Sequence, residues 1–217
     1  MVVASMSAAS GPQAVARLAA AFEGTRDVVA LTNPGFGPGE PLPVSFAALV
    51  EHTVAGVRAA AAGAPYVLAG HGTGALLATA VARRLADGDS TPRALVLLDP
   101  PAPGADPRDT QLAELVGAFA LGDPAAGDDG RLVATGGYRR LLRDVPEPPD
   151  GLPVLRLCPT GSALRGARSA DGDTVLDGDP LEFVMGDAAA TAAALDHWLS
   201  HLAGTRPTRR SAHDEGR

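Results

Sequence analysis

The residues best placed to do chemistry lie in a glycine-rich turn, Gly70-His71-Gly72-Thr73-Gly74. The turn follows a short apolar run and precedes a helix rich in alanine and leucine. A strand, a glycine turn and a helix in this order can raise a nucleophile above a sheet, as in G-x-S-x-G. They can also lay a pyrophosphate on a helix N-terminus, as in G-x-G-x-x-G/A. The nucleophile position of the first pattern is occupied by Gly72, so the meaning of this glycine decides between the two chemistries.

The elements around this turn alternate between strands and helices, which predicts an α/β fold. Strands bearing apolar residues on both faces indicate a mostly parallel sheet flanked by helices. The apolar runs predict strands at 1–5, 27–31, 66–69, 93–99, 154–158 and 181–185. Helical periodicity predicts helices at 14–22, 46–62, 74–85 and 188–202.

The segment between the strands at 93–99 and 154–158 has a different pattern. It contains helical stretches at 111–119 and 128–143, the second broken at Gly136-Gly137. We expect these stretches to form a small helical lid insertion at about 105–146. The domain would then span 1–203, with a disordered tail at 204–217 and a long loop at 160–180.

Composition excludes several classes of protein. The chain has 217 residues, 46% of them hydrophobic, which is enough for one well-buried domain. A net charge of −7 without a basic stripe argues against binding to nucleic acid. The single cysteine, Cys158, excludes an internal disulfide. No apolar run approaches the ~20 residues that cross a bilayer, and no signal peptide is evident, so we expect a cytoplasmic protein without membrane contact.

Six segments, in order, resemble the thioesterase domains that end modular polyketide synthases, a branch of the α/β-hydrolase family. The segments are NPGFGPGEPLPVS, AGHGTGALLATAVARRL, RALVLLDPPAPG, DDGRLVATGGYRRLL, GLPVLRL and FVMGD. The resemblance runs from about Val2 to Leu202. It implies an α/β-hydrolase fold and an enzyme that takes an acyl chain from an acyl carrier protein onto a serine. The chain is then released by hydrolysis or macrolactonisation. The implied partners are a polyketide or acyl-thioester substrate and an acyl carrier protein, with no cofactor or metal.

The sequence departs from this family at two of the three triad positions. Gly72 stands where the family has its serine, and a glycine has no oxygen with which to form an acyl-enzyme. The family's G-D-H and its following loop are replaced by Gly186-Asp187 and then Ala188, so the triad histidine is missing. Asp99, at the end of a strand, matches the family's triad acid. The sequence therefore predicts a degenerate member of the family.

Asp99 is the candidate catalytic residue. In an apolar chamber burial would raise its pKa and suit it to general acid or base chemistry. The alternative is a relic that caps a loop. The candidate substrate-binding residues come from the turn and from the loop after the first strand, where the family forms its oxyanion hole: Gly72, Thr73, His71, Ser5 and Ser7. Thr73 can equally be structural, and His71 a packing and hydrogen-bonding residue.

Three functions remain open at this point. The first is a thioesterase-like protein that binds a polyketide chain and promotes a non-covalent step such as cyclisation or dehydration. The second is a catalytically dead scaffold or binding partner in a polyketide assembly. The third is an NAD(P)-binding protein, in which Gly72 would allow close pyrophosphate approach and Asp99 would bind a ribose. The third is disfavoured because two strands precede the turn, whereas the nucleotide motif normally follows the first strand.

Overall fold

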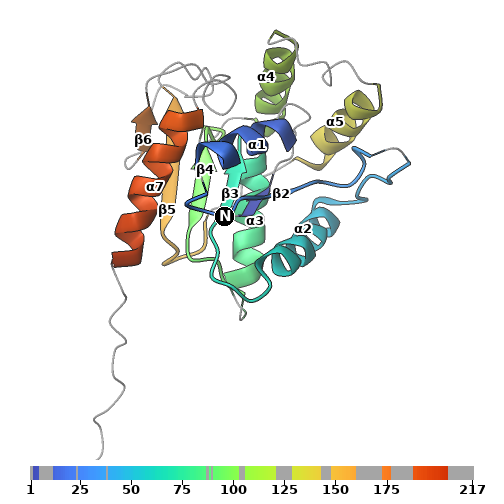
Figure 1. Ribbon diagram of the computed structural model, residues 1–217. Coiled ribbons are helices and arrows are strands. Elements are labelled where there is room, and N and C mark those ends of the chain that lie inside the picture. Colours follow the sequence, from blue (N-terminus) through green and yellow to red (C-terminus); the bar gives the residue numbers. More distant parts are fainter. Residues whose placement is uncertain are drawn as a thin grey trace, which may run out of the picture.

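A parallel sheet forms the centre of the molecule in a computed structural model (Figure 1). The structure describes residues 2–4, 12–22, 24–37, 39–86, 88, 90–102, 106–120, 129–142, 148–159, 173–176 and 188–204. The described strands pair in the order β2-β1-β3-β4-β5-β6, and every pairing is parallel. They are β1 (Val2–Ala4), β2 (Val29–Leu31), β3 (Leu68–His71), β4 (Leu95–Leu98), β5 (Val154–Pro159) and β6 (Asp173–Leu176). The predicted α/β fold is confirmed.

Helices cover both faces of this sheet (Figure 1). The described helices are α1 (Pro12–Ala21), α2 (Phe46–Ala61), α3 (Gly74–Ala86), α4 (Pro107–Ala120), α5 (Asp129–Leu141) and α7 (Ala188–Gly204). The Ser45 side chain caps α2 by accepting a hydrogen bond from the Ala48 N–H at 3.1 Å. Across the described ranges, no helix combines the length and apolar character that a membrane crossing requires.

Two apolar layers fill the space between the sheet and its helices. Leu68, Leu95 and Leu97 pack with α2 and α3 on one face. Ala69, Val96 and Leu98 pack with α1 and α7 on the other. Neighbouring residues of a strand point to opposite faces, so a strand covered on both sides is apolar at every position. This is why the β4 segment and the start of β3, residues 68–70, contain no polar side chain.

The predicted loop at 160–180 is wrong in part. Residues Asp173–Leu176 form β6, which pairs in parallel with β5. β6 is the last described strand on this side of the sheet. Strands pair through backbone N–H and C=O groups, which every residue except proline supplies in full, so a stretch rich in glycine and aspartate can still contain a strand. The predicted strand at 181–185 lies outside the described residues. Gly204, expected in the tail, is the last residue of α7.

The predicted break at Gly136-Gly137 is also wrong, because α5 continues through both glycines. A Cβ atom on Gly137 would lie 2.5 Å from Cδ1 of Leu42, whereas one on Gly136 would meet no atom within 4 Å. Gly137 therefore lets Leu42 approach the helix closely. Tertiary packing holds the helix despite the low helix propensity of glycine.

Candidate functional site

The predicted turn and the predicted acid lie side by side at the carboxyl edge of the sheet. β3 pairs with β4 so that His71 lies opposite Leu98, and the Gly72 N–H donates to the Leu98 carbonyl at 2.8 Å. Gly72 directly follows β3 and Asp99 directly follows β4, so the two residues are neighbours at this edge. The connections after β1 and β2 run in opposite directions along the sheet, and ligands of open α/β sheets bind at such a switch point. Ser5 and Ser7 lie outside the described residues.

Two of the three glycines of the turn, Gly70 and Gly72, serve different purposes. Gly72 has a φ of +54°, a conformation that glycine adopts readily and other residues adopt at a cost. A Cβ on Gly70 would lie 2.3 Å from the Gly74 carbonyl oxygen, because α3 runs back directly against β3. The turn thus has the sharp strand-to-helix geometry of a nucleophile elbow, and its apex carries no side chain.

The remaining turn residues differ in exposure. The Thr73 side chain is fully buried. The backbone carbonyl of Thr73 accepts a hydrogen bond from the Leu76 N–H at 3.1 Å, at the start of α3. The His71 ring is partly buried, and desolvation lowers its pKa to about 4. His71 is therefore neutral near pH 7, so it can exchange hydrogen bonds there but is a weak base.

Asp99 occupies an unusual backbone conformation. It is 4% exposed, has a φ of +44°, and donates its N–H to the Leu157 carbonyl of β5 at 2.8 Å. Aspartate tolerates this left-handed region better than most residues, but the conformation still costs free energy. A buried acid held in this way beside the elbow is where general acid or base chemistry could occur.

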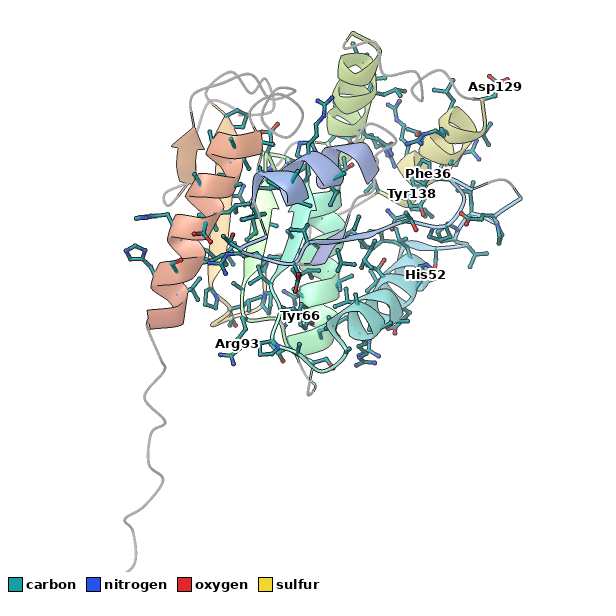
Figure 2. All side chains as sticks on the ribbon, viewed as in Figure 1. Phe36, His52, Tyr66, Arg93, Asp129 and Tyr138 are labelled. Carbon is teal, nitrogen blue, oxygen red and sulfur yellow. The ribbon has the colours of Figure 1, made fainter. Side chains whose placement is uncertain are left out.

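Sequence reasoning missed an aromatic contact that joins α5 to the loop after β2. Figure 2 labels Phe36 and Tyr138 at this junction, and their rings stack with centroids 5.3 Å apart. The Tyr138 hydroxyl donates to the Pro34 carbonyl at 2.8 Å. Burial raises the pKa of Tyr138, and the nearby Glu40 raises it further, so the phenol remains a donor. The signal in the sequence is the spacing of Ala134 and Tyr138 on one helical face.

Glu40 holds the same loop in shape. Its carboxylate accepts hydrogen bonds from the Gly35 N–H at 3.1 Å and the Gly37 N–H at 2.9 Å. Leu42 then packs against Gly137 of α5. Through these contacts the Gly/Pro-rich loop fixes where α5 stands relative to the sheet.

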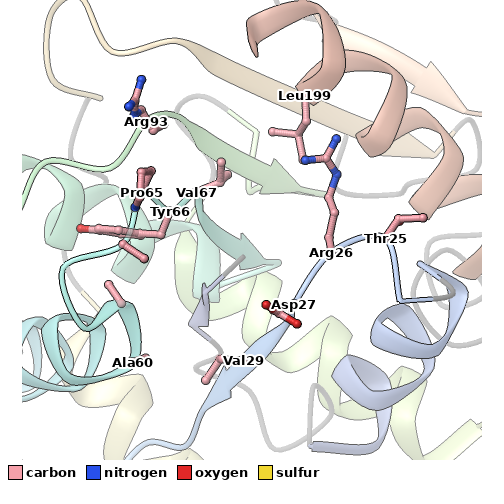
Figure 3. Close-up of a pocket in the computed structure, with 12 residues that line it drawn as sticks. Thr25, Arg26, Asp27, Val29, Ala60, Pro65, Tyr66, Val67, Arg93 and Leu199 are labelled. Carbon is pink, nitrogen blue, oxygen red and sulfur yellow. The ribbon is translucent and has the colours of Figure 1, made fainter.

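A pocket of about 370 Å³ lies at the opposite, amino edge of the sheet (Figure 3). Most of its lining comes from the segments that precede β2, β3 and β4, including Asp27, Tyr66 and Arg93, and Leu199 of α7 also contributes. The predicted site residues that the structure describes, Gly72, Thr73, His71 and Asp99, do not line it. These four residues lie at the carboxyl edge and not in this pocket.

The two histidines with metal-ligand spacing are on α7. The His197 and His201 rings lie 4.4 Å apart and tilted, and Nδ1 of His201 lies 2.8 Å from the His197 carbonyl. Within the part of the chain that the structure describes, no group of three or more potential metal ligands occurs.

His71 is expected to make the stability of the fold depend on pH. Burial lowers its pKa from 6.5 in a free ring to about 4. In the unfolded chain the His71 ring binds a proton near pH 6.5, whereas in the folded protein the ring stays neutral down to about pH 4. Stability is therefore fully present above this window and is lost as the pH falls through it. We expect a loss on the order of 1–3 kcal/mol, moderated by the ring's partial contact with solvent.

Urea unfolding at several pH values across this window measures the effect. In His71→Gln the free energy of unfolding should depend less on pH across this window. His197→Gln, which changes an exposed ring, should leave this pH dependence unaltered. If His71→Gln and the unmodified protein lose the same stability as the pH falls, His71 is not the source of the pH dependence.

The chain matches the thioesterase domain family model over residues 7–120. It is 36% identical over 205 residues to erythronolide synthase EryA3 of Saccharopolyspora erythraea, covering 90% of this chain and 6% of that protein. It is 46% identical over 90 residues to spectinabilin polyketide synthase system protein NorC of Streptomyces orinoci, covering 42% of this chain and 4% of that protein. The chain thus spans only a small part of the curated relatives it matches.

Solved structures show the same fold. The type II thioesterase YbtT from the yersiniabactin pathway aligns with a TM-score of 0.68 and 20% identity, covering 93% of each chain. The Vlm2 thioesterase domain with a bound dodecadepsipeptide aligns with a TM-score of 0.64 and 22% identity, covering 90% of this chain and 91% of that one. The chain has the α/β-hydrolase fold of these structures and, as a relative of polyketide synthases, belongs to the thioesterase domain family.

Proposed function

We propose that this protein binds a polyketide chain, free or on an acyl carrier protein, and promotes a non-covalent step such as cyclisation or dehydration. The observation that carries the proposal is the elbow itself. Gly72 keeps the elbow backbone at a φ of +54° without a nucleophile, and the buried Asp99 stands at the end of the neighbouring strand. Acyl-enzyme hydrolysis at this position has no attacking atom.

Asp99 is the residue we assign to proton transfer. In a dehydration, its carboxylate would take a proton from the carbon next to the thioester carbonyl, and the β-hydroxyl would leave as water after receiving that proton. In a cyclisation, it would take the proton of a chain hydroxyl as that oxygen adds to the β-carbon of an α,β-unsaturated acyl group, and it would return the proton to the α-carbon, so that the product is an isomer of the substrate. Neither route places a covalent bond on the protein.

Substrate orientation is the second contribution. α4 and α5 stand over the carboxyl edge of the sheet (Figure 1), and we assign them to a lid. A chamber that holds a flexible chain in a reactive conformation lowers the entropic part of the activation barrier. A protein that has no nucleophile can therefore still catalyse a reaction of that chain. The relationship to polyketide synthases supports a polyketide as the chain and an acyl carrier protein as its carrier.

A binding or scaffolding role is the second candidate. Apolar side chains on the two lid helices face solvent: Leu112 is 46%, Val116 60% and Val133 68% exposed. Leu112 and Val116 are one helical turn apart on α4 and so share a face. Exposed apolar side chains grouped in this way favour contact with another protein.

The two candidates differ in what happens to a polyketide intermediate. We would incubate the protein and its Asp99→Asn variant with the intermediate as a carrier-protein thioester and as a free acid, and follow products by mass spectrometry. The proposal predicts a product of unchanged composition or one lighter by water. Its rate should fall at least about 100-fold in Asp99→Asn, as for loss of a general acid or base. Asp129→Asn, which changes an exposed acid on α5 (Figure 2), is the matched control.

Intact-protein mass spectrometry in the same reactions should show no acyl adduct. An adduct, or equal turnover by Asp99→Asn, would overturn the proposed chemistry. Binding of the carrier-protein thioester without turnover would leave the scaffold role as the function.

A further inference from the structure

Gln111 is a buried polar side chain on α4. It is 1% exposed, and Pro107, one turn earlier on the same face, is also buried. Arg108 and Leu112 on the other faces are exposed. The face of α4 that carries Gln111 is therefore turned into the protein.

The amide of Gln111 has no partner there. Among the residues that the structure describes, neither Nε2 nor Oε1 of this side chain has a hydrogen-bond partner, although both atoms are buried. A primary amide offers two donors and an accepting oxygen, and folded proteins satisfy nearly all such buried groups. A hydrogen-bonding group of a bound ligand would pair the donor and the acceptor that are left unpaired on this side chain.

The position of α4 indicates where such a group would come from. The helix begins eight residues after Asp99 and stands above the edge of the sheet where β3 and β4 end, beside α5 (Figure 1). Tyr66 and Arg93, which mark the amino edge, lie at the other end of the molecule (Figure 2). Gln111 is thus on the side of the fold where the acyl chain is proposed to lie.

We infer that the Gln111 amide binds an oxygenated unit of the acyl chain that presents an acceptor and a donor next to each other, such as a β-hydroxyketone. This inference rests on the proposed function and adds a specificity-determining residue to it. The ketone oxygen would accept from Nε2–H, and the hydroxyl would donate to Oε1. A saturated chain would leave both amide groups unpaired, and a site with buried polar groups discriminates strongly against a ligand that cannot pair them.

The test compares N-acetylcysteamine thioesters of one medium chain length, one set carrying a β-hydroxyketone at successive positions and one fully saturated. Their dissociation constants are measured by calorimetry for the unmodified protein and for Gln111→Leu. At one position of the β-hydroxyketone, Gln111→Leu should weaken binding about tenfold, as expected for one to two lost hydrogen bonds. Binding of the saturated thioester should stay the same or tighten.

Stability without ligand gives an independent readout. Gln111→Leu removes two unpaired polar groups from a buried site, so its thermal midpoint should rise by roughly 2–6 °C. Gln111→Met serves as a second variant in case the branched side chain does not fit. Asp109→Asn, an exposed change on the same helix, should alter neither the affinity nor the midpoint.

The outcomes separate the two proposals. If the unmodified protein binds no thioester of either set, the proposed function fails, and the role of Gln111 fails with it. If thioesters bind but Gln111→Leu affects oxygenated and saturated chains equally, only the assignment of Gln111 is overturned.

Discussion

Replacing Gly70 with alanine is expected to lower the free energy of unfolding by at least about 3 kcal/mol, or to prevent folding altogether. The new Cβ would lie 2.3 Å from the Gly74 carbonyl oxygen, 2.6 Å from the carbonyl carbon and 2.8 Å from the Ala75 Cα. These are backbone atoms of α3 and cannot rotate away as a side chain can. The methyl group would therefore push α3 off β3 and disturb the elbow. Urea unfolding followed by circular dichroism measures the effect.

Gly136→Ala is the matched control, because it adds the same methyl group to a glycine with no atom within 4 Å of the new position. Gly136 lies inside α5, where alanine favours the helix by about 1 kcal/mol over glycine. This variant should be as stable as the unmodified protein or more stable. A Gly70→Ala protein that unfolds at the same urea concentration as Gly136→Ala would show that α3 does not pack against β3 as described.

Replacing Tyr138 with alanine is expected to cost about 3–5 kcal/mol, the usual loss for a large aromatic side chain in a core. Tyr138 is fully buried, its ring stacks on Phe36, and its hydroxyl donates to the Pro34 carbonyl at 2.8 Å. The change removes two contacts between α5 and the loop after β2, the ring stack and the hydrogen bond. Hydrogen exchange should show the amides of α5 losing protection more than those of α3.

Two conservative variants separate the ring from its hydroxyl. Tyr138→Phe keeps the stack and should cost only about 1 kcal/mol, the net value of one hydrogen bond. Tyr66→Phe removes a hydroxyl that donates to the Ser90 carbonyl at 2.5 Å at the amino edge, so it should lower stability without loosening α5. Equal loss of α5 protection in Tyr66→Phe and Tyr138→Ala would mean that the aromatic contact does not hold this helix.

Local patterns along the sequence determined the class of fold and the place of the candidate site. The β4 segment and residues 68–70 of β3 carry no polar side chain because both sheet faces are covered, and the α2 segment repeats its apolar residues at helical spacing. A glycine turn between a strand and a helix placed Gly72 at an elbow. Parallel strands bring their carboxyl ends to one edge, which placed Asp99 beside it. These features depend on residues close together in the chain, so they can be read from order and spacing.

Contacts between distant segments were decided only by the tertiary structure. Tyr138 and Pro34 are 104 residues apart, and nothing near either residue indicates the other. α5 passes through Gly136-Gly137 because Leu42, from a remote loop, packs against it, whereas local propensity favours a break. β6 forms within a Gly- and Asp-rich stretch of the sequence because β5 offers backbone partners at its edge. The unpaired amide of Gln111 arises in the same way, since burial depends on what surrounds a side chain in space and not on its neighbours in sequence.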